Sequence, residues 1–467
     1  MPGRRWIATW DPDDADFWRD CGRSVARRNL IVSMLAEFLG FAIWQLWSVV
    51  AVYLPRAGFH LSVGELFWLV SLPALIGATL RFPYGFAVPV LGGRNWTVVS
   101  AGLLLIPTIM LATVVRHPEA PTWLLLVAAA SAGFGGGNFA SSMSNISFFY
   151  PDRDKGYALG LNAAGGNIGV AVVQCLVPAV IGLGVLGLGT TTTRDLSLQW
   201  AGLVWIPFIA LAVICAHLFM DNLVVTRGGL KEYAVVVRTS HTWLMSILYI
   251  GTFGSFIGYS AALPLLIRTQ FPHVNPLQYA FLGPLLGSLA RPIGGRLADR
   301  IGGARVTAWT FAVMIAATLC VILVLGRSAA PGAFPFFLTT FVVLFITTGV
   351  GNGSTVRMIP EAFRATHAGD VGRRPGGDGA VADRGARRES AAALAVTSAM
   401  GAYGGFLVPQ SYGVSISLTG GPRGALVGFM AYYLACLALT WWYRGRRARP
   451  DARGEPLLVR ARAETPG

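Results

Sequence analysis

The chain has 467 residues, of which 54% are apolar and only 13% are charged. An average soluble domain carries about 25% charged residues, so this composition excludes a large soluble enzyme. The formal charge is +15, but the 37 basic residues punctuate hydrophobic segments and form no patch with interleaved aromatic residues, which argues against nucleic-acid binding. The five scattered cysteines and six histidines show no metal-ligand spacing, so no metal site or other cofactor is predicted.

Hydropathy predicts an all-α membrane protein with twelve transmembrane helices, because about 20 apolar residues suffice to cross a bilayer. The helices are expected at 30–54, 63–91, 95–115, 121–150, 157–186, 200–221, 241–269, 276–300, 304–326, 333–363, 390–419 and 422–443. The predicted divisions are an amino-terminal arm 1–29, a first six-helix half 30–221, a linker 222–240, a second half 241–443 and a basic tail 444–467.

The loop 364–389 inside the second half is rich in Gly, Arg and Asp and has no apolar periodicity. We expect it to be flexible and without regular structure. The amino terminus shows no short apolar core followed by a cleavage site, so the first helix is expected to serve as its own insertion signal.

The distribution of basic residues predicts the topology. Of the 37, 28 fall in the arm, the tail and the loops on the side of the termini; six fall on the other side and three within helices. Lys and Arg accumulate in cytoplasmic loops. A multi-pass protein of the cell membrane with both termini in the cytoplasm is therefore predicted.

An internal repeat divides the helices into two pseudo-symmetric halves. Arg81 is followed by Gly four residues later and by Gly-Gly at eleven and twelve; Arg291, 210 residues further on, has the same pattern. A second echo pairs Gly137-Asn138 with Gly351-Asn352. Repeats of this kind place a substrate site near the bilayer midplane between the halves.

Arg81 and Arg291 lie at equivalent depths inside predicted helices, where an arginine costs at least about 2.5–3.5 kcal/mol. Guanidinium forks match the planar oxygens of a small anion, so an anion site is the favoured interpretation. The alternative is a structural ion pair with one of three acids, Glu37, Glu65 or Asp299. A proton or cation pathway would predict more acid than base in the core, and here the reverse holds.

Further candidates lie on helix faces. Asn138, Ser141, Ser142 and Asn145 are spaced i, i+3, i+4 and i+7 and form one polar stripe. Asn167 of the fifth segment offers an amide donor to an anion.

In the seventh segment Tyr249 and Phe253 share a face, although aromatic pairs at this spacing usually belong to a core. In the eleventh segment Gly401, Gly404 and Gly405 permit either a close backbone approach to substrate or simple bending.

The segment GGRLADRIGGARV, 294–306, resembles the loop signature of the major facilitator superfamily. In such a loop Asp299, Arg296 and Arg300 are able to form an intracellular charge-and-helix-cap latch. The counterpart after the second helix, YGFAVPVLGGRNWT, lacks the acid. This half-degenerate pattern is similar to the nitrate/nitrite porter family, and the resemblance extends to four further stretches: GGGNFASSMSNISFFYPDRDKGYALGLNAAGGNIG, ALPLLIRTQF after GTFGSFIGYS, GNGSTVRMIP and GAYGGFLVPQSYG.

The resemblance implies roles for the candidate residues. Arg81 and Arg291 would bind the substrate, Phe139 and Phe253 would flank it, and Tyr249 and Asn167 would donate hydrogen bonds. Two glycine faces would be the elements on which the halves rock: Gly165, Gly166 and Gly169 on one, and Gly401, Gly404 and Gly405 on the other. Asp299 and Arg300 would take part in gating.

The predicted function is alternating-access transport of nitrate and nitrite, in nitrate assimilation, by a monomer in a lipid bilayer. Exchange of the two anions is favoured because core acids are scarce; proton symport would need a titratable group, and Glu37 is the one acid well inside a predicted helix. A carrier for another small anion such as formate or cyanate stays open. A nitrate sensor lacks an output domain, and an enzyme lacks any nucleophile–base pair, so no catalytic residue is predicted.

Overall fold

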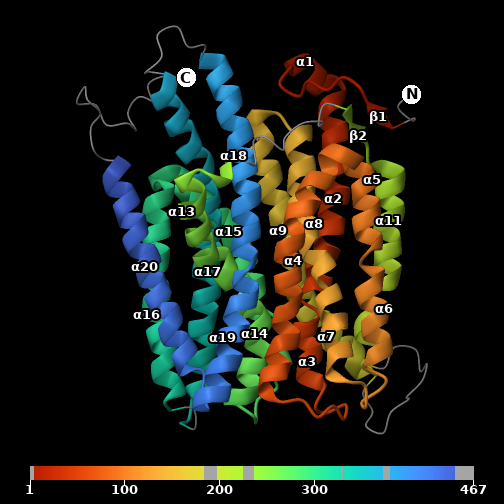
Figure 1. The fold of residues 1–467 in the computed structure, drawn as a ribbon, viewed down its shortest axis with the longest axis vertical. Helices are drawn as coiled ribbons and strands as arrows, with labels where there is room; N and C mark the ends of the chain where they lie inside the picture. The colour runs from red at the N-terminus through yellow and green to blue at the C-terminus, as the bar shows by residue number, and fades with distance from the viewer. Residues whose placement is uncertain (1–4, 184–196, 225–235, 328–329, 372–378, 448–467) are drawn as a thin grey trace.

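The computed structural model describes residues 5–183, 197–224, 236–327, 330–371 and 379–447. Long helices run side by side along one axis, and β1 at the amino-terminal end lies at the same end of the molecule as the termini marked in Figure 1. The helices of the first half are α1 (Ala15–Phe17), the π-helix η1 (Trp18–Gly22), α2 (Arg23–Trp44), α3 (Trp47–Tyr53), α4 (Val63–Leu91), α5 (Gly93–Gly102), α6 (Leu105–Val114), α7 (Thr122–Ser131), α8 (Gly133–Phe149), α9 (Asp152–Leu183), α10 (Trp200–Leu203) and α11 (Ile206–Phe219).

The second half repeats this arrangement with fewer interruptions. Its helices are α13 (Ser240–Tyr249), the π-helix η4 (Ile250–Gly254), α14 (Ser255–Gln270), the 3-10 helix η5 (Pro276–Gln278), α15 (Leu282–Ile301), α16 (Gly303–Leu325), α17 (Ala333–Val371), α18 (Gly379–Ala402), α19 (Gly404–Thr419) and α20 (Arg423–Arg447).

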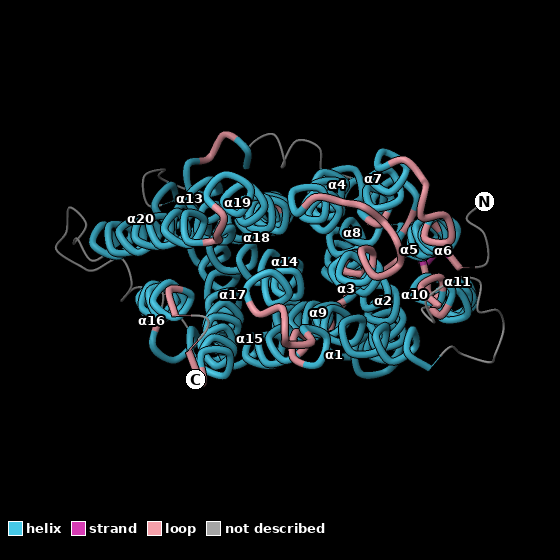
Figure 2. Tube along the Cα trace, turned by 90° about the horizontal axis from the view of Figure 1, so that it is seen from below, coloured by secondary structure: helices cyan, strands magenta, loops and turns pink. Residues whose placement is uncertain are grey.

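Eleven of the described helical segments are long and apolar enough to cross a membrane. The predicted eighth span, now α15, falls short of that measure because its 20 residues carry Arg291, Arg296, Asp299 and Arg300. It nevertheless packs among the spanning helices (Figure 2). Large apolar side chains such as Trp309 and Leu323 are exposed on the outer helices, as expected of a surface that faces lipid. The predicted twelve-helix architecture is confirmed.

The sequence repeat has a backbone counterpart. Gly92 and Gly302 both have positive φ, +88° and +92°, a conformation that L side chains rarely adopt. Each ends one helix, and the next helix begins at the following glycine, Gly93 or Gly303. The repeated Gly-Gly therefore makes the same tight turn in both halves.

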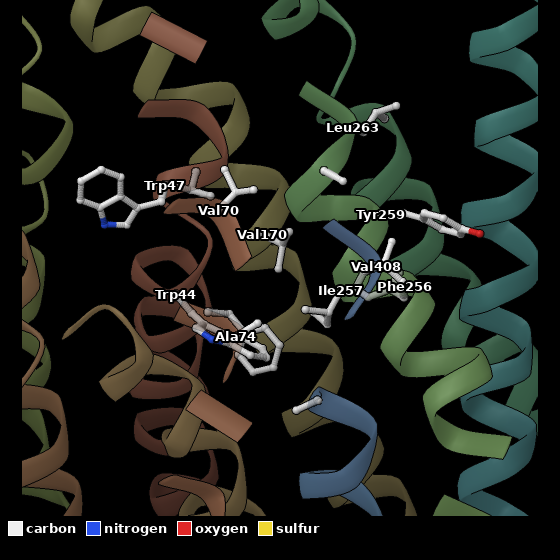
Figure 3. Packing of buried hydrophobic residues seen from close by; sticks show 14 of the residues in the cluster. Trp44, Trp47, Val70, Ala74, Val170, Phe256, Ile257, Tyr259, Leu263 and Val408 are labelled. Atoms are coloured by element: carbon white, nitrogen blue, oxygen red, sulfur yellow. The ribbon is translucent and has the colours of Figure 1, made fainter. Parts of the chain in front are cut away.

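The two halves lie side by side in the view along the helices (Figure 2). Their contact is continuous with the hydrophobic core. Trp44, Ala74 and Val170 of the first half face Ile257 and Val408 of the second half across this contact (Figure 3). The halves thus share one buried layer, which surrounds the candidate site.

The amino-terminal arm is part of the first half. Its strand β1 (Trp6–Ile7) pairs in parallel with β2 (Asn222–Leu223), which follows the last helix of that half. Arg28 forms an ion pair of 2.6 Å with Asp221, next to β2. The arm and the start of the linker therefore close the same end of the first half.

The structure differs from the prediction for the loop 364–389. Helix α17 extends to Val371 and α18 begins at Gly379, so helix covers both ends of this stretch. The residues between, 372–378, lie outside the described residues. Helix continuation overrides the glycine content because each end extends an existing helix and needs no new nucleation.

Candidate functional site

Arg81 and Arg291 lie on equivalent helices, α4 and α15, on either side of the contact between the halves. Both side chains are buried, with exposed fractions of 1% and 6%. Neither forms an ion pair in the described part of the chain, so the structural ion pair considered as an alternative is absent there. Of the three acids proposed for it, Glu65 instead completes a capping box with Ser62 at the start of α4.

The Arg81 guanidinium is held by two backbone carbonyl groups. Its Nε donates to Gly136 O at 3.1 Å, within the same half. Its Nη1 donates to Ser398 O at 2.6 Å, and Ser398 lies on α18 of the other half. Arg81 therefore joins the two halves directly.

Aromatic rings surround this guanidinium. The Arg81 Cζ lies 4.5 Å from the ring centroid of Phe139, 5.2 Å from that of Phe253 and 5.4 Å from that of Trp44. Phe139 and Phe253, from opposite halves, are stacked with centroids 6.1 Å apart. Tyr249 stacks on Phe253 at 5.2 Å. These rings exclude water and so strengthen the charge interactions between them.

Several polar atoms at this place are buried without a hydrogen-bond partner. They include Arg81 Nη2, Arg291 Nη1 and the Tyr249 hydroxyl, all of which can donate to an anion. Tyr249 lies beside Arg291 and within range of its charge. The side chain of Asn167 is also buried, and its carbonyl oxygen has no partner. Unpaired donors on both halves are what an anion site between them requires.

Glu37 of α2 lies next to the arginines. It is fully buried and interacts electrostatically with both Arg81 and Arg291. Its Oε2 accepts a hydrogen bond of 2.5 Å from Asn162 Nδ2, which also reaches Ser142 Oγ at 2.6 Å. Sequence reasoning missed Asn162; its place four residues before Gly166, on the same face of α9, was the available signal.

The glycine face of α9 packs on α2. A Cβ on Gly166 would overlap the Glu37 side chain, and one on Gly169 would overlap Phe38 O. Gly165 lies against Met34. Any larger residue would separate the helices or displace Glu37.

The glycine face of α18 and α19 packs on the seventh transmembrane segment. A Cβ on Gly404 would overlap the backbone of Gly254, and one on Gly401 would overlap the Tyr249 ring. Gly405 faces Ile257 of its own half and, in the other half, Ala74. This face therefore lies both against a candidate site residue and against the contact between the halves.

Asp299 has a different partner from the one predicted. It pairs with Arg357 of α17 at 3.0 Å, and not with Arg296 or Arg300, whose side chains are exposed. The Arg357 guanidinium also lies close to Gly156 of α9, since a Cβ there would be 3.1 Å from Arg357 Nη1. The charge pair thus stands where the halves meet on the side of the termini.

On the other side of the arginines, hydrogen bonds join the halves. Gln410 Nε2 donates to Ser71 Oγ at 2.6 Å, and Gln174 Nε2 donates to Ser260 O at 2.7 Å. Together with the bond from Arg81 to Ser398, they link the two halves directly. Ser398 and Gln410 were missed from the sequence because single polar residues in apolar helices carry no spacing signal.

Comparisons with known proteins agree with this architecture. Residues 33–372 match the family model described as Major Facilitator Superfamily. Two solved structures share the fold: the xylose transporter XylE from E. coli, with a TM-score of 0.64, 12% identity and coverage of 90% of this chain and 98% of that one, and a D-xylose-proton symporter, with a TM-score of 0.65, 14% identity and coverage of 89% and 97%.

Similarity in sequence is much higher to nitrate/nitrite carriers. The chain is 44% identical to the nitrate/nitrite transporter NarU of Salmonella typhimurium and 42% identical to NarU of Escherichia coli, over 95% of this chain and 97% of each relative. It is 36% identical to the probable nitrate/nitrite antiporter NarK2 of Thermus thermophilus, again over 95% and 97%.

Proposed function

The chain belongs to the Major Facilitator Superfamily and, within it, to the nitrate/nitrite porters, and from this premise we propose that it carries nitrate and nitrite across the membrane by exchange. The observation that supports this most is the pair of buried arginines, one on each half, with unpaired guanidinium nitrogens. Two forks without a protein carboxylate as ion-pair partner match a small planar oxyanion. It is a membrane transporter and not an enzyme.

The anion would lie between Arg81 and Arg291, with Phe139 and Phe253 as walls and Tyr249 and Asn167 as hydrogen-bond partners. In this conformation Arg81 bonds to Ser398 O of the other half. An anion that competes for this guanidinium would weaken that link and allow the halves to rock. Substrate binding and alternating access are thereby coupled.

The packed glycine faces support the rocking motion. Close backbone contacts without side-chain interdigitation let helices slide with little steric resistance, so Gly166 with Gly169, and Gly401 with Gly404 and Gly405, would serve as the surfaces on which the helices move. The Asp299–Arg357 pair lies within the second half, so it would keep α15 and α17 together while Arg357 moves away from Gly156 as the side of the termini opens; Arg300 is exposed beside it.

Exchange follows from the cost of moving an unloaded site. Two arginines beside a single acid, Glu37, leave excess positive charge in a low-dielectric core when no anion is bound, so return of the carrier is favoured only when a second anion is bound. Proton symport is the second candidate, because Glu37 is buried beside both arginines and its protonation would change their charge balance.

Transport by the purified protein in liposomes tests the proposal. Vesicles are loaded with nitrite or with an inert anion, nitrate is added outside, and a proton gradient is imposed or omitted. We expect uptake only with internal nitrite. Uptake into inert vesicles driven by the proton gradient would instead establish symport through Glu37, and no uptake under any condition would refute nitrate transport.

The orientation and oligomeric state are part of the same proposal. We place both termini in the cytoplasm and expect a functional monomer. Cys21 in the amino-terminal arm is exposed, so a membrane-impermeant thiol reagent applied to intact cells should leave it unlabelled. Labelling from outside would reverse the orientation.

A further inference from the structure

A small cavity lies beside Glu37, inside the first half. It has room for about one water-sized sphere and lies between α2, α5 and α8. Its lining residues are neutral except for Glu37; they are Ser33, Ala36, Glu37, Thr97, Ser100, Asn138, Ser141 and Ser142. Nothing in the proposed anion path uses this cavity.

Three oxygen atoms in this lining are buried and have no hydrogen-bond partner: Glu37 Oε1, Asn138 Oδ1 and Ser33 Oγ. All three side chains are at most 2% exposed. The Asn138 amide nitrogen is directed to Ala36 O at 3.5 Å, which leaves its carbonyl oxygen for the cavity. Buried polar atoms without a partner indicate a further small ligand, a water molecule or an ion.

The remaining hydroxyl groups in the lining add further acceptors. Thr97, Ser100 and Ser141 donate to carbonyl oxygens of their own helices, so the lone pairs of their oxygens stay available. Ser142 Oγ accepts from Asn162 Nδ2, which also fixes Glu37 through its other oxygen. The lining thus gathers several oxygen atoms around one carboxylate, and its hydroxyl groups can donate as well as accept.

We propose that this cavity is a sodium site, in which Glu37 Oε1, Asn138 Oδ1 and Ser33 Oγ coordinate one Na⁺. Hard cations prefer carboxylate, amide carbonyl and hydroxyl oxygens. A water molecule satisfies the same three atoms by donating to Glu37 and Asn138 and accepting from Ser33, but only a cation also offsets the charge of the buried carboxylate. The inference rests on the proposed anion transport and adds a cation to it.

The arginines connect the two ligands. Glu37 interacts with Arg81 and Arg291, whose positive charges oppose a cation at the carboxylate. An anion bound between the arginines removes part of that opposition, so each ligand raises the affinity for the other. Sodium binding is therefore nitrate-dependent, and the site turns an exchanger into a carrier that a sodium gradient can drive.

Binding of ²²Na⁺ to the purified full-length protein in choline gluconate tests the site directly. We expect saturable binding, displaced by unlabelled NaCl, whose affinity rises about tenfold when choline nitrate is added, within the range of about 5–150-fold typical of coupled sites. Glu37→Gln, which keeps the shape and removes the charge, should reduce the affinity at least about tenfold. Ser33→Ala should reduce the affinity for Na⁺ less. Because this variant keeps the Glu37 carboxylate, it tests the site even if Glu37→Gln fails to fold.

Glu65→Gln is the matched control, because Glu65 lies in the capping box at the start of α4, outside the cavity lining, and glutamine preserves that motif. It should bind ²²Na⁺ as the unchanged protein does. The sodium site would be overturned if the unchanged protein showed no saturable binding. It would also be overturned if Glu37→Gln and Ser33→Ala both bound ²²Na⁺ with the affinity of the unchanged protein.

Exchange of internal nitrite for external nitrate in sodium-free liposomes separates this inference from the proposed function. Loss of exchange there, in a protein that binds ²²Na⁺, would refute free exchange and leave the sodium site standing. The sodium site alone would be refuted by three observations together. Exchange is intact, the protein binds no ²²Na⁺, and an imposed sodium gradient neither accelerates exchange nor drives nitrate uptake in the absence of nitrite.

Discussion

The two halves of the molecule place equivalent arginines in unequal surroundings. Arg81 is bonded to Gly136 and Ser398 and lies against three aromatic rings. Arg291 lies beside Tyr249, and its Nη1 has no hydrogen-bond partner. In the proposed site Arg81 would therefore have a structural role as well as a binding role, whereas Arg291 Nη1 would be left to engage a ligand. A sequence repeat sets equal positions, but the neighbours that each half provides decide what those positions do.

Replacing each arginine with lysine should give the largest effects and test the difference between Arg81 and Arg291 directly. Arg81→Lys loses the fork and the bonds to two carbonyls, so we expect nitrate uptake to fall by more than about 100-fold and the melting temperature to fall as well. Arg291→Lys should lower nitrate uptake by a similar factor but change the melting temperature little. Initial rates in liposomes and thermal unfolding in detergent measure the two effects.

Near-normal uptake in both lysine variants would refute the anion site. Equal losses of thermal stability would show instead that the two arginines have the same structural weight.

Substitutions on the two glycine faces should have an intermediate effect. Gly404→Ala pushes a Cβ into the backbone of Gly254, and Gly169→Ala pushes one into Phe38 O; neither backbone can yield as a flexible side chain does. We expect each to cost about 1–3 kcal/mol of stability and to slow nitrate uptake. Gly160→Ala on α9 and Gly428→Ala on α20 meet nothing within 4 Å and serve as controls. If the controls slow uptake as much, close packing is not what the faces provide.

The smallest effects should come from the two turns that follow Gly92 and Gly302. In the first half, buried Asn222 Oδ1 accepts from Arg94 N at 3.0 Å and Asn95 N at 3.3 Å. Asn222→Ala should cost about 1–2 kcal/mol, because two amide groups at the start of α5 lose their partner.

In the second half, the Asp299–Arg357 pair lies near the corresponding turn, with both side chains nearly half exposed. Asp299→Asn should therefore cost at most about 1 kcal/mol. Thermal unfolding of the two variants ranks them, and a larger loss for Asp299→Asn would reverse the order expected from burial.

Much of the fold was predictable because it depends on local pattern. Apolar length predicted the spans, the Gly-Gly repeat predicted the two equivalent turns, and two arginines in apolar helices indicated the candidate site. The helical ends of the loop 364–389 were missed, because composition does not show how far a neighbouring helix continues.

The partners of the candidate residues were not predictable, because they come from distant parts of the chain. Ser398 lies 317 residues from Arg81, and Asn162 lies 125 from Glu37. The partner of Asp299 differs from the prediction for the same reason. Arg357, 58 residues away, contacts the carboxylate, whereas Arg296 and Arg300 on the same helix as Asp299 are exposed.

By itself the sequence determined the helices, their repetition and the charges placed inside them, because hydropathy and the cost of a buried charge act residue by residue. Only the tertiary structure decided which donors and acceptors are left unpaired and where they meet. Hydrogen bonds and charge interactions depend on distances of a few ångströms between helices, and those distances are set by packing of the whole bundle. The unpaired guanidinium nitrogens between the halves and the oxygen-lined cavity beside Glu37 both arise at that level.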